Sequence, residues 1–181
     1  MNQEIENTIK SLKNGGVILY PTDTIWGLGC DANNDEAIKR IFKIKKRLES
    51  KLLICLVSDK EMLKSLNLKI PNINLTQYPT TIIYSNAQGV SKLLINKIDN
   101  STAIRIPKDK FCQKLIKRFG GPITSTSANL SGDPFPKNFL DINNEIINSV
   151  DYIVNLRKEE TMINPSKIYK IGKSGNIIKI R

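Results

Sequence analysis

Three short stretches of the chain contain residues whose types and spacing could bind a polar, negatively charged ligand. Pro21 to Thr24 reads PTDT and follows an apolar run, so two hydroxyls and a carboxylate stand where a buried strand would end. Residues 123–132 read ITSTSANLSG and hold five hydroxyls and one carboxamide. Lys45 and Arg47 add positive charge at the end of an expected helix. Such groups can orient a ligand by hydrogen bonds and attract its negative charge.

Each stretch also has a purely structural explanation. A PTDT sequence is typical of turns, Lys and Arg in a last helical turn complement the helix dipole, and Ser/Thr-rich segments often form surface turns. For any one stretch taken alone, the structural explanation is favoured. A functional interpretation therefore depends on several stretches occurring together in one chain.

Composition excludes several kinds of active site. The chain has no histidine, which rules out Ser-His-Asp triads, Cys-His pairs and His-ligated metals. Its three cysteines, Cys30, Cys55 and Cys112, are odd in number and lack CxxC spacing, which disfavours a disulfide framework and a zinc site. We expect these cysteines to be reduced thiols that are mostly buried.

Length and charge bound the kind of protein. The 181 residues, 40 % of them hydrophobic, are enough for one compact α/β domain over residues 1–181. The net charge of +11 favours anionic ligands such as nucleic acid or nucleotide phosphates. Lysine is also abundant on plain helix faces, so the charge could equally reflect composition, and both interpretations stay open. The N-terminus lacks an apolar signal-peptide core and no run approaches the ~18 apolar residues of a membrane span, so we expect a cytoplasmic protein without a membrane segment.

Helical spacing and strand-like runs predict the elements of the N-terminal half. Ile5, Ile9 and Leu12 fall on one helical face, and Asn34 or Asp35 can cap a second helix. The spacing from Ser58 to Glu61 is that of a capping box. The expected order is helix 2–13, strand 17–20, the PTDT loop with close backbone approach at Gly27 and Gly29, a capped helix, strand 52–57 and a helix from Ser58.

The C-terminal half shows the same mixture. We expect strands at 80–84 and 102–106, a helix bearing Phe111 to Phe119, a strand at 123–125, a helix at 140–148, a strand at 152–155 and a hairpin of 167–170 with 176–180. Helices and strands alternate irregularly, which predicts a single-domain α/β fold with a twisted mixed sheet and packed helices. Neither GxGxxG nor a Walker A motif is present, so any nucleotide must be held by other groups.

Five motifs occur together along the chain: YPTDTIWGLGCDA at 20–32, Lys45-x-Arg47, AIRIP at 103–107, STSANLSGDP at 125–134 and NPSKI at 164–168. Their content and order resemble the YrdC-like family, and within it the single-domain TsaC-type threonylcarbamoyl-AMP synthases. The resemblance implies a twisted sheet with a basic concave groove. It also implies the conversion of L-threonine, bicarbonate and ATP to threonylcarbamoyl-adenylate and pyrophosphate, with Mg²⁺ accompanying the nucleotide. The expected partners are downstream threonylcarbamoyl-transfer proteins that modify tRNA, and direct contact with tRNA is left open.

The resemblance also assigns binding residues by position. A triphosphate needs fixed cations, and an arginine at a strand end can clamp a carboxylate. No side-chain nucleophile and no resident metal are expected, because the substrates' own amine and carbamate react and catalysis rests on positioning and charge. The ATP side comprises Lys45, Arg47, Lys51, Ser101 and Asn129, and the L-threonine side comprises Thr24, Arg105, Ser127 and Ser166.

Two other functions are compatible with parts of this pattern. A non-catalytic RNA-binding relative could use the same groove, but it would need phosphate-binding cations without a carboxylate clamp beside small hydroxyls. An enzyme that makes a carbamoyl-adenylate for metallocentre assembly would resemble large multidomain proteins, whose extra segments do not fit in this chain. The complete threonine half of the site therefore favours the synthase.

Overall fold

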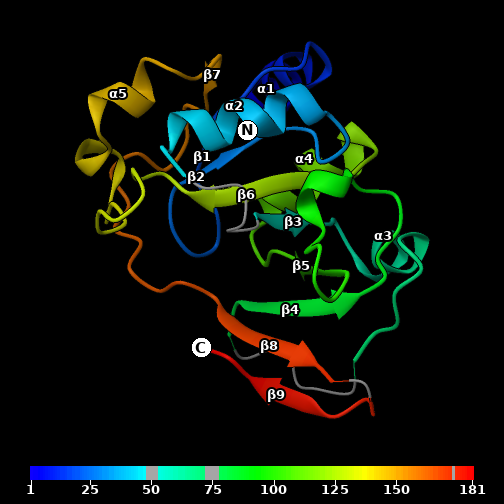
Figure 1. The fold of residues 1–181 in the computed structure, drawn as a ribbon. Coiled ribbons are helices and arrows are strands. Elements are labelled where there is room, and N and C mark those ends of the chain that lie inside the picture. The colour runs from blue at the N-terminus through cyan, green and yellow to red at the C-terminus, as the bar shows by residue number, and fades with distance from the viewer. Residues whose placement is uncertain (48–52, 72–77, 173) are drawn as a thin grey trace.

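The computed structural model describes residues 1–47, 53–71, 78–172 and 174–181 as one α/β domain (Figure 1). In the described part, one mixed sheet has the strand order β7-β1-β2-β6-β3-β5-β4-β8-β9. The pairs β1–β7, β3–β5 and β4–β8 are parallel, and the other neighbours are antiparallel. The prediction of a mixed sheet with packed helices is confirmed. The strands are β1 (Ile18–Tyr20), β2 (Gly27–Gly29), β3 (Ile54–Leu56), β4 (Thr80–Ser85), β5 (Ser101–Arg105), β6 (Ile123–Ser127), β7 (Tyr152–Ile153), β8 (Lys167–Ile171) and β9 (Ile177–Lys179).

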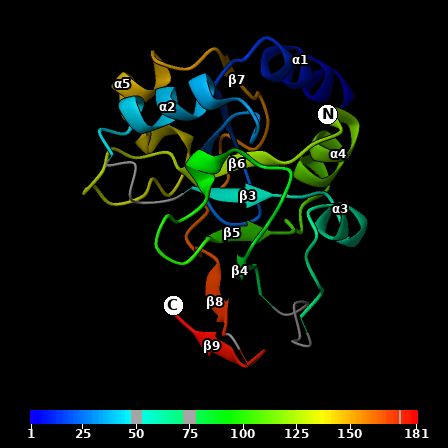
Figure 2. The same ribbon diagram turned by 45° about the vertical axis from the view of Figure 1, so that its right-hand side comes forward.

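Helices gather over the β7-β1-β2-β6 end of the sheet, while the β8–β9 hairpin extends from the other end (Figures 1 and 2). Helices α1 and α4 share a core with Ile18 and Tyr20 of β1, whereas α2 shares a core with Leu19. Because neighbouring residues of a strand point to opposite faces, α1 and α4 cover one face and α2 covers the other. The helices are α1 (Asn2–Lys13), α2 (Asp35–Ile44), α3 (Lys60–Ser65), α4 (Lys110–Phe119) and α5 (Asn144–Ile147), with 3-10 turns η1 (Lys92–Leu94) and η2 (Phe139–Asp141).

Local signals account for the long helices. The Asn34 side chain accepts a hydrogen bond from the Ala37 amide at the start of α2, as expected for an N-cap. Helix α4 ends at Gly120, whose φ of 87° is the left-handed conformation that suits glycine at a helix end. None of the helices in the described ranges is long and apolar enough to cross a membrane.

Strand β2 was not predicted, since Gly27 to Gly29 was expected to belong to a loop. Two glycines give a strand no apolar pattern, yet this position between β1 and β6 requires them. A Cβ on Gly29 would lie 2.4 Å from the Thr124 carbonyl oxygen and 2.7 Å from the Tyr20 ring. The sequence suggested close backbone approach here, and the structure shows that the neighbours are other strands.

Two element predictions were wrong in detail. Residues 140–148 do not form one helix, because Ile142 is extended and Asn143 starts α5 as a new cap. The third helix is capped by Asp59 rather than Ser58, since the Asp59 carboxylate accepts the Met62 amide hydrogen. The prediction for the cysteines is confirmed: Cys30, Cys55 and Cys112 are free and buried.

Candidate functional site

A cavity of about 600 Å³ opens on the sheet face formed by β3, β4, β5 and β6. Its walls also include the β1–β2 loop, the turn after β6 and the segment before β8. Lys45 does not line it, and Lys51 lies outside the described residues. The structure brings the other seven predicted site residues together on its walls: Thr24, Arg47, Ser101, Arg105, Ser127, Asn129 and Ser166.

Arg105 is the most buried of the basic residues that line the cavity, with 4 % of its surface exposed. Its Nη1 donates to Thr24 Oγ1 at 3.0 Å, and its Nη2 lies 3.5 Å from the Asp23 carboxylate. Its Nε is buried and has no hydrogen-bond partner among the described residues. A guanidinium that lines a cavity is suited to an anionic ligand.

Hydroxyl groups fix the loop that presents Thr24. Thr22 Oγ1 lies 2.8 Å from Thr24 Oγ1, donates to the Ile25 carbonyl at 2.8 Å and accepts the Thr24 amide hydrogen at 3.0 Å. The PTDT sequence therefore forms an ST-type turn, which is its purely structural role. The same turn also places the Thr24 hydroxyl on the cavity wall.

Ser166 reaches the site from the segment before β8. Its Oγ lies 2.8 Å from Thr81 Oγ1, and Thr81 pairs with Arg105 across β4 and β5. Thr81 was not predicted as a site residue. In the sequence, Thr81 is one of several β-branched residues of a predicted strand, which does not indicate a role in a site. Only the pairing of β4 with β5 places it beside Arg105.

Lys45 is 1 % exposed and holds the turn after β6. Its Nζ donates to the carbonyl oxygens of Ser127 and Asn129 at 2.5 and 2.6 Å and to Asn129 Oδ1 at 3.1 Å. Its own carbonyl oxygen accepts the Ser131 amide hydrogen at 2.9 Å. Burial, with a smaller effect from Arg47, lowers the pKa of Lys45 to about 7. Lys45 therefore binds two residues that line the cavity, Ser127 and Asn129, but does not line the cavity itself.

Asn129 and Ser127 form a small polar unit on top of Lys45. Ser127 Oγ donates to Asn129 Oδ1 at 2.5 Å, and Asn129 Nδ2 donates to the Asp133 carbonyl at 2.6 Å. Every polar atom of the carboxamide is thus used to fix its orientation. The Ser127 oxygen keeps lone pairs available on the cavity wall.

Arg47 stands just beyond α2 and reaches the wall of the cavity at β6. Its Nη1 lies 3.4 Å from Thr126 Oγ1, a long hydrogen bond. Burial lowers the pKa of Arg47 from its ordinary value, but an arginine remains charged at neutral pH. This side chain supplies positive charge on the side of the cavity opposite to β8.

Ser101 belongs to a charged cluster at the far end of the cavity. Its Oγ donates to Asp99 Oδ1 at 2.6 Å, and Lys170 Nζ lies 2.6 Å from Asp99 Oδ2. The Lys170 contact, followed by that of Ser101, lowers the pKa of Asp99 to about 2. Lys170 and Arg181 line the cavity and were missed, because the parallel pairing of β4 and β8 decides which hairpin side chains face it.

The walls therefore combine four basic residues with small hydroxyls, the carboxamides of Asn96 and Asn129, and the carboxylates of Asp99 and Asp133. The basic residues are Arg47, Arg105, Lys170 and Arg181. Within the described residues, no three carboxylate or cysteine groups converge to hold a metal ion. The site can bind a polyanion and orient a small polar molecule, but it offers no protein cage for a cation.

Comparisons with known proteins agree with this geometry. The profile of the Sua5/YciO/YrdC family, described as "Telomere recombination", matches residues 10–181. A Vibrio vulnificus protein named threonylcarbamoyl-AMP synthase is 31 % identical over 163 residues, which cover 85 % of this chain and 87 % of that protein.

Two solved structures share the fold. Escherichia coli YciO superposes with a TM-score of 0.85 at 22 % identity, covering 100 % of this chain and 89 % of YciO. Pyrococcus abyssi Sua5 complexed with L-threonine superposes with a TM-score of 0.82 at 23 % identity, covering 98 % of this chain and 53 % of Sua5. Since the profile spans nearly the whole chain, this protein belongs to the Sua5/YciO/YrdC family.

Proposed function

We propose that the protein is a threonylcarbamoyl-AMP synthase, which joins L-threonine, bicarbonate and ATP into threonylcarbamoyl-adenylate with release of pyrophosphate. The observation that carries this proposal is one cavity that holds both predicted halves of the site, Arg105 with Thr24 and Ser166 on one side and Arg47 with Asn129 on another. Relatives that carry this name match over most of their length.

The Arg105 side of the cavity suits an amino acid. The Arg105 guanidinium, which lines the cavity, can pair with a carboxylate, while the hydroxyls of Thr24, Ser127 and Ser166 can accept from an ammonium or pair with a hydroxyl. The same fold holds L-threonine in Pyrococcus abyssi Sua5. We assign this side to L-threonine.

The remaining cations suit the nucleotide. Arg47 lies across the cavity from the β8 segment, near the polar turn formed by Ser127 and Asn129. We assign Arg47, Asn129 and Ser101 to ATP, and we extend the expectation by adding Lys170 and Arg181 as cations near its phosphates. The assignment of Lys51 to ATP remains a prediction. We propose that Lys45 positions Asn129 rather than contacting ATP. Mg²⁺ would then arrive with the nucleotide and be held mainly by its phosphates.

The reaction needs no protein nucleophile. The amine of threonine and bicarbonate give a carbamate with loss of water, and a carbamate oxygen attacks the α-phosphorus of ATP. A new oxygen–phosphorus bond forms as the bond to pyrophosphate breaks. The contribution of the protein is to hold the two substrates in line and to stabilise the negative charge that develops on the phosphates. Arg105 is placed to hold the amino acid, and Arg47 is placed to stabilise the charge on the phosphates.

The alternative of a non-catalytic RNA-binding protein is not favoured. A groove that only binds the RNA backbone does not need a buried arginine beside three small hydroxyls. Delivery of the product to threonylcarbamoyl-transfer proteins, direct tRNA contact and a cytoplasmic location remain predictions.

The first prediction concerns the overall reaction. Purified protein should release pyrophosphate from ATP with Mg²⁺ only when both L-threonine and bicarbonate are present, since the carbamate must form before it can attack. The measurement is coupled pyrophosphate detection, with threonine or bicarbonate omitted as controls. Equal release without threonine would contradict the proposed function.

The second prediction concerns Arg47. Arg47→Ala should lower the rate of pyrophosphate release about a hundredfold or more, because a fixed cation near the developing charge is lost. Lys43 is the matched control, since it is exposed and lies in the last turn of α2. Lys43→Ala should change the rate little and stability by only ~0.3–1 kcal/mol. If Arg47→Ala keeps full activity and only melts earlier, Arg47 is a helix-end cation.

The third prediction concerns Arg105. Arg105→Lys keeps the charge but loses the planar fork, so the KM for L-threonine should rise roughly tenfold, in line with one or two lost charge-assisted hydrogen bonds. The affinity for ATP should change little. Thermal melting establishes that the variant is folded. Weaker ATP binding with an unchanged threonine requirement would instead place Arg105 in the phosphate site.

A further inference from the structure

A second cavity of about 740 Å³ lies on the other face of β4 and β5, away from the candidate substrate site. Ile82 and Tyr84 of β4 line it, whereas Thr81 and Ile83 of the same strand line the substrate site. Neighbouring residues of a strand point to opposite faces, so the sheet itself separates the two cavities. Its size falls within the range of ~300–1,000 Å³ that is usual for small-molecule sites.

The floor of this second cavity is apolar. Leu63, Ile82 and Ile104 each have 2–3 % of their surface exposed, and Ile106 and Pro107 extend the floor beyond the end of β5. Such a surface favours a flat or extended hydrocarbon body over a purely ionic ligand.

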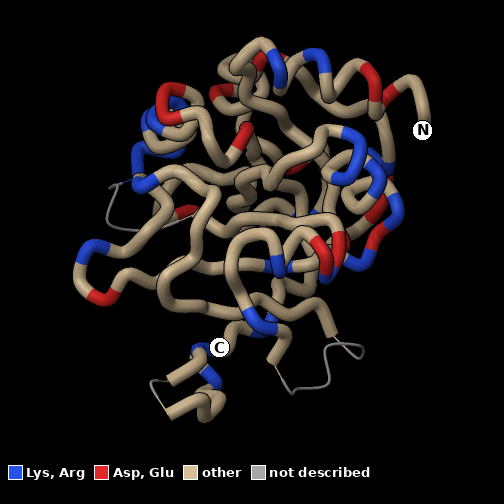
Figure 3. Tube along the Cα trace, turned by 90° about the vertical axis from the view of Figure 1, so that its right-hand side faces the viewer, with Lys and Arg blue, Asp and Glu red and all other residues tan. Residues whose placement is uncertain are grey.

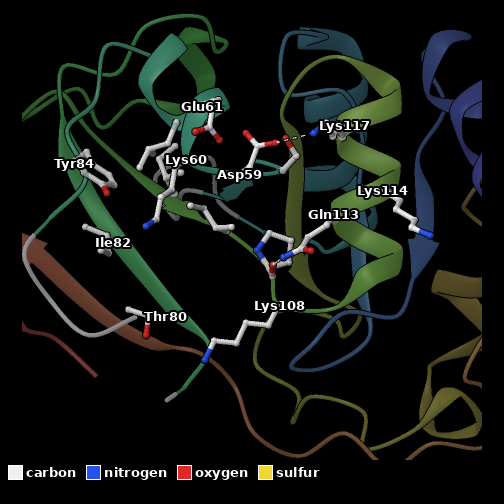
Figure 4. Close-up of a pocket in the computed structure, with 15 residues that line it drawn as sticks. Asp59, Lys60, Glu61, Thr80, Ile82, Tyr84, Lys108, Gln113, Lys114 and Lys117 are labelled. Atoms are coloured by element: carbon white, nitrogen blue, oxygen red, sulfur yellow. Dashed lines mark hydrogen bonds and ion pairs between the residues drawn. The ribbon is translucent and has the colours of Figure 1, made fainter. Parts of the chain in front are cut away.

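Tyr84 provides a polar group within this apolar wall. The residue is 5 % exposed and lines the cavity. Figure 4 shows its ring on the sheet wall with the hydroxyl on the cavity side. Burial raises the pKa of Tyr84 to about 12, so the hydroxyl stays protonated at neutral pH and can donate to a ligand. A hydroxyl on the cavity wall can donate to water or to a bound ligand.

Four lysines and two carboxylates, those of Asp59 and Glu61, line the cavity. Lys60 at the start of α3 and Lys108 before α4 approach from opposite ends, with their amino groups directed toward β4, whereas Lys114 extends away (Figure 4). Lys117 faces Asp59 at 3.9 Å, which closes the end between α3 and α4. Figure 3 shows basic and acidic positions interspersed over this side of the chain, so its surface is not uniformly basic.

We propose that this cavity is a second binding site, for a small amphipathic anion whose apolar body rests on Ile82 and Ile104 and whose carboxylate or phosphate lies between Lys60 and Lys108. The Tyr84 hydroxyl donates to a polar atom of the bound molecule. The proposal is independent of the reaction assigned to the other face of the sheet.

Methyl NMR of isoleucine-labelled full-length protein tests this site with three probes: 1-naphthoate, 1-naphthyl phosphate and neutral 1-naphthol. The two anions should shift the methyl signals of Ile82 and Ile104 and leave that of Ile83, on the other face, in place. The anion that binds with the higher affinity identifies the preferred head group, carboxylate or phosphate. Excess ATP should not displace them.

Variants locate the charges and the hydroxyl. Lys60→Glu with Lys108→Glu should weaken binding of the preferred anion roughly tenfold, because each exposed ion pair contributes a few-fold. The matched control, Lys64→Glu with Lys110→Glu, changes the same charge on exposed residues of α3 and α4 outside the cavity and should have little effect. Tyr84→Phe should weaken binding roughly two- to tenfold. Any of four results would overturn the proposal: no shift at millimolar probe, a shift of Ile83 instead, naphthol binding as tightly as the anions, or equal losses in both double variants.

Discussion

The Nζ atom of Lys45 lies within hydrogen-bonding distance of three oxygens from the turn after β6, and the candidate site depends on this contact. Two of the oxygens are main-chain carbonyls and the third belongs to the carboxamide of Asn129. Removing a lysine from water is costly, and these acceptors offset that cost only while all three are in place. The contact therefore fixes the turn, and through it the orientation of Asn129 and Ser127.

The sheet supplies the second constraint. Because β2 is squeezed between β1 and β6, only glycine fits at position 29, and this close packing brings the Thr24 loop to the same cavity as Ser127. The alternation of β4 and β5 then separates two cavities on opposite faces of the sheet. Arg105 lines the candidate site together with Thr81, while Ile104 and Ile82 line the second cavity.

Features encoded by neighbouring residues could be predicted from the sequence. The Asn34 cap, the Gly120 terminus and the apolar stripes of α1 and α4 are local, and the motifs indicated seven residues that line one cavity. Features that depend on distant partners could not be predicted in this way. Lys45 contacts residues 82 and 84 positions further along the chain, so its sequence position indicated a charge but not where that charge is directed. Lys170 was missed for the same reason, since the β4–β8 pairing orients it.

Lys45 is a buried ammonium group bound to the turn after β6 rather than an exposed cation. NMR of the lysine side-chain nitrogens over a pH titration tests this most directly, with Lys45→Arg identifying the signal. One ammonium signal should exchange slowly with water and lose its proton near pH 7, because burial disfavours its charge. If the Lys45 signal exchanges rapidly and titrates near the ordinary lysine value of 10.5, the turn is held by other contacts and this account of the site is wrong.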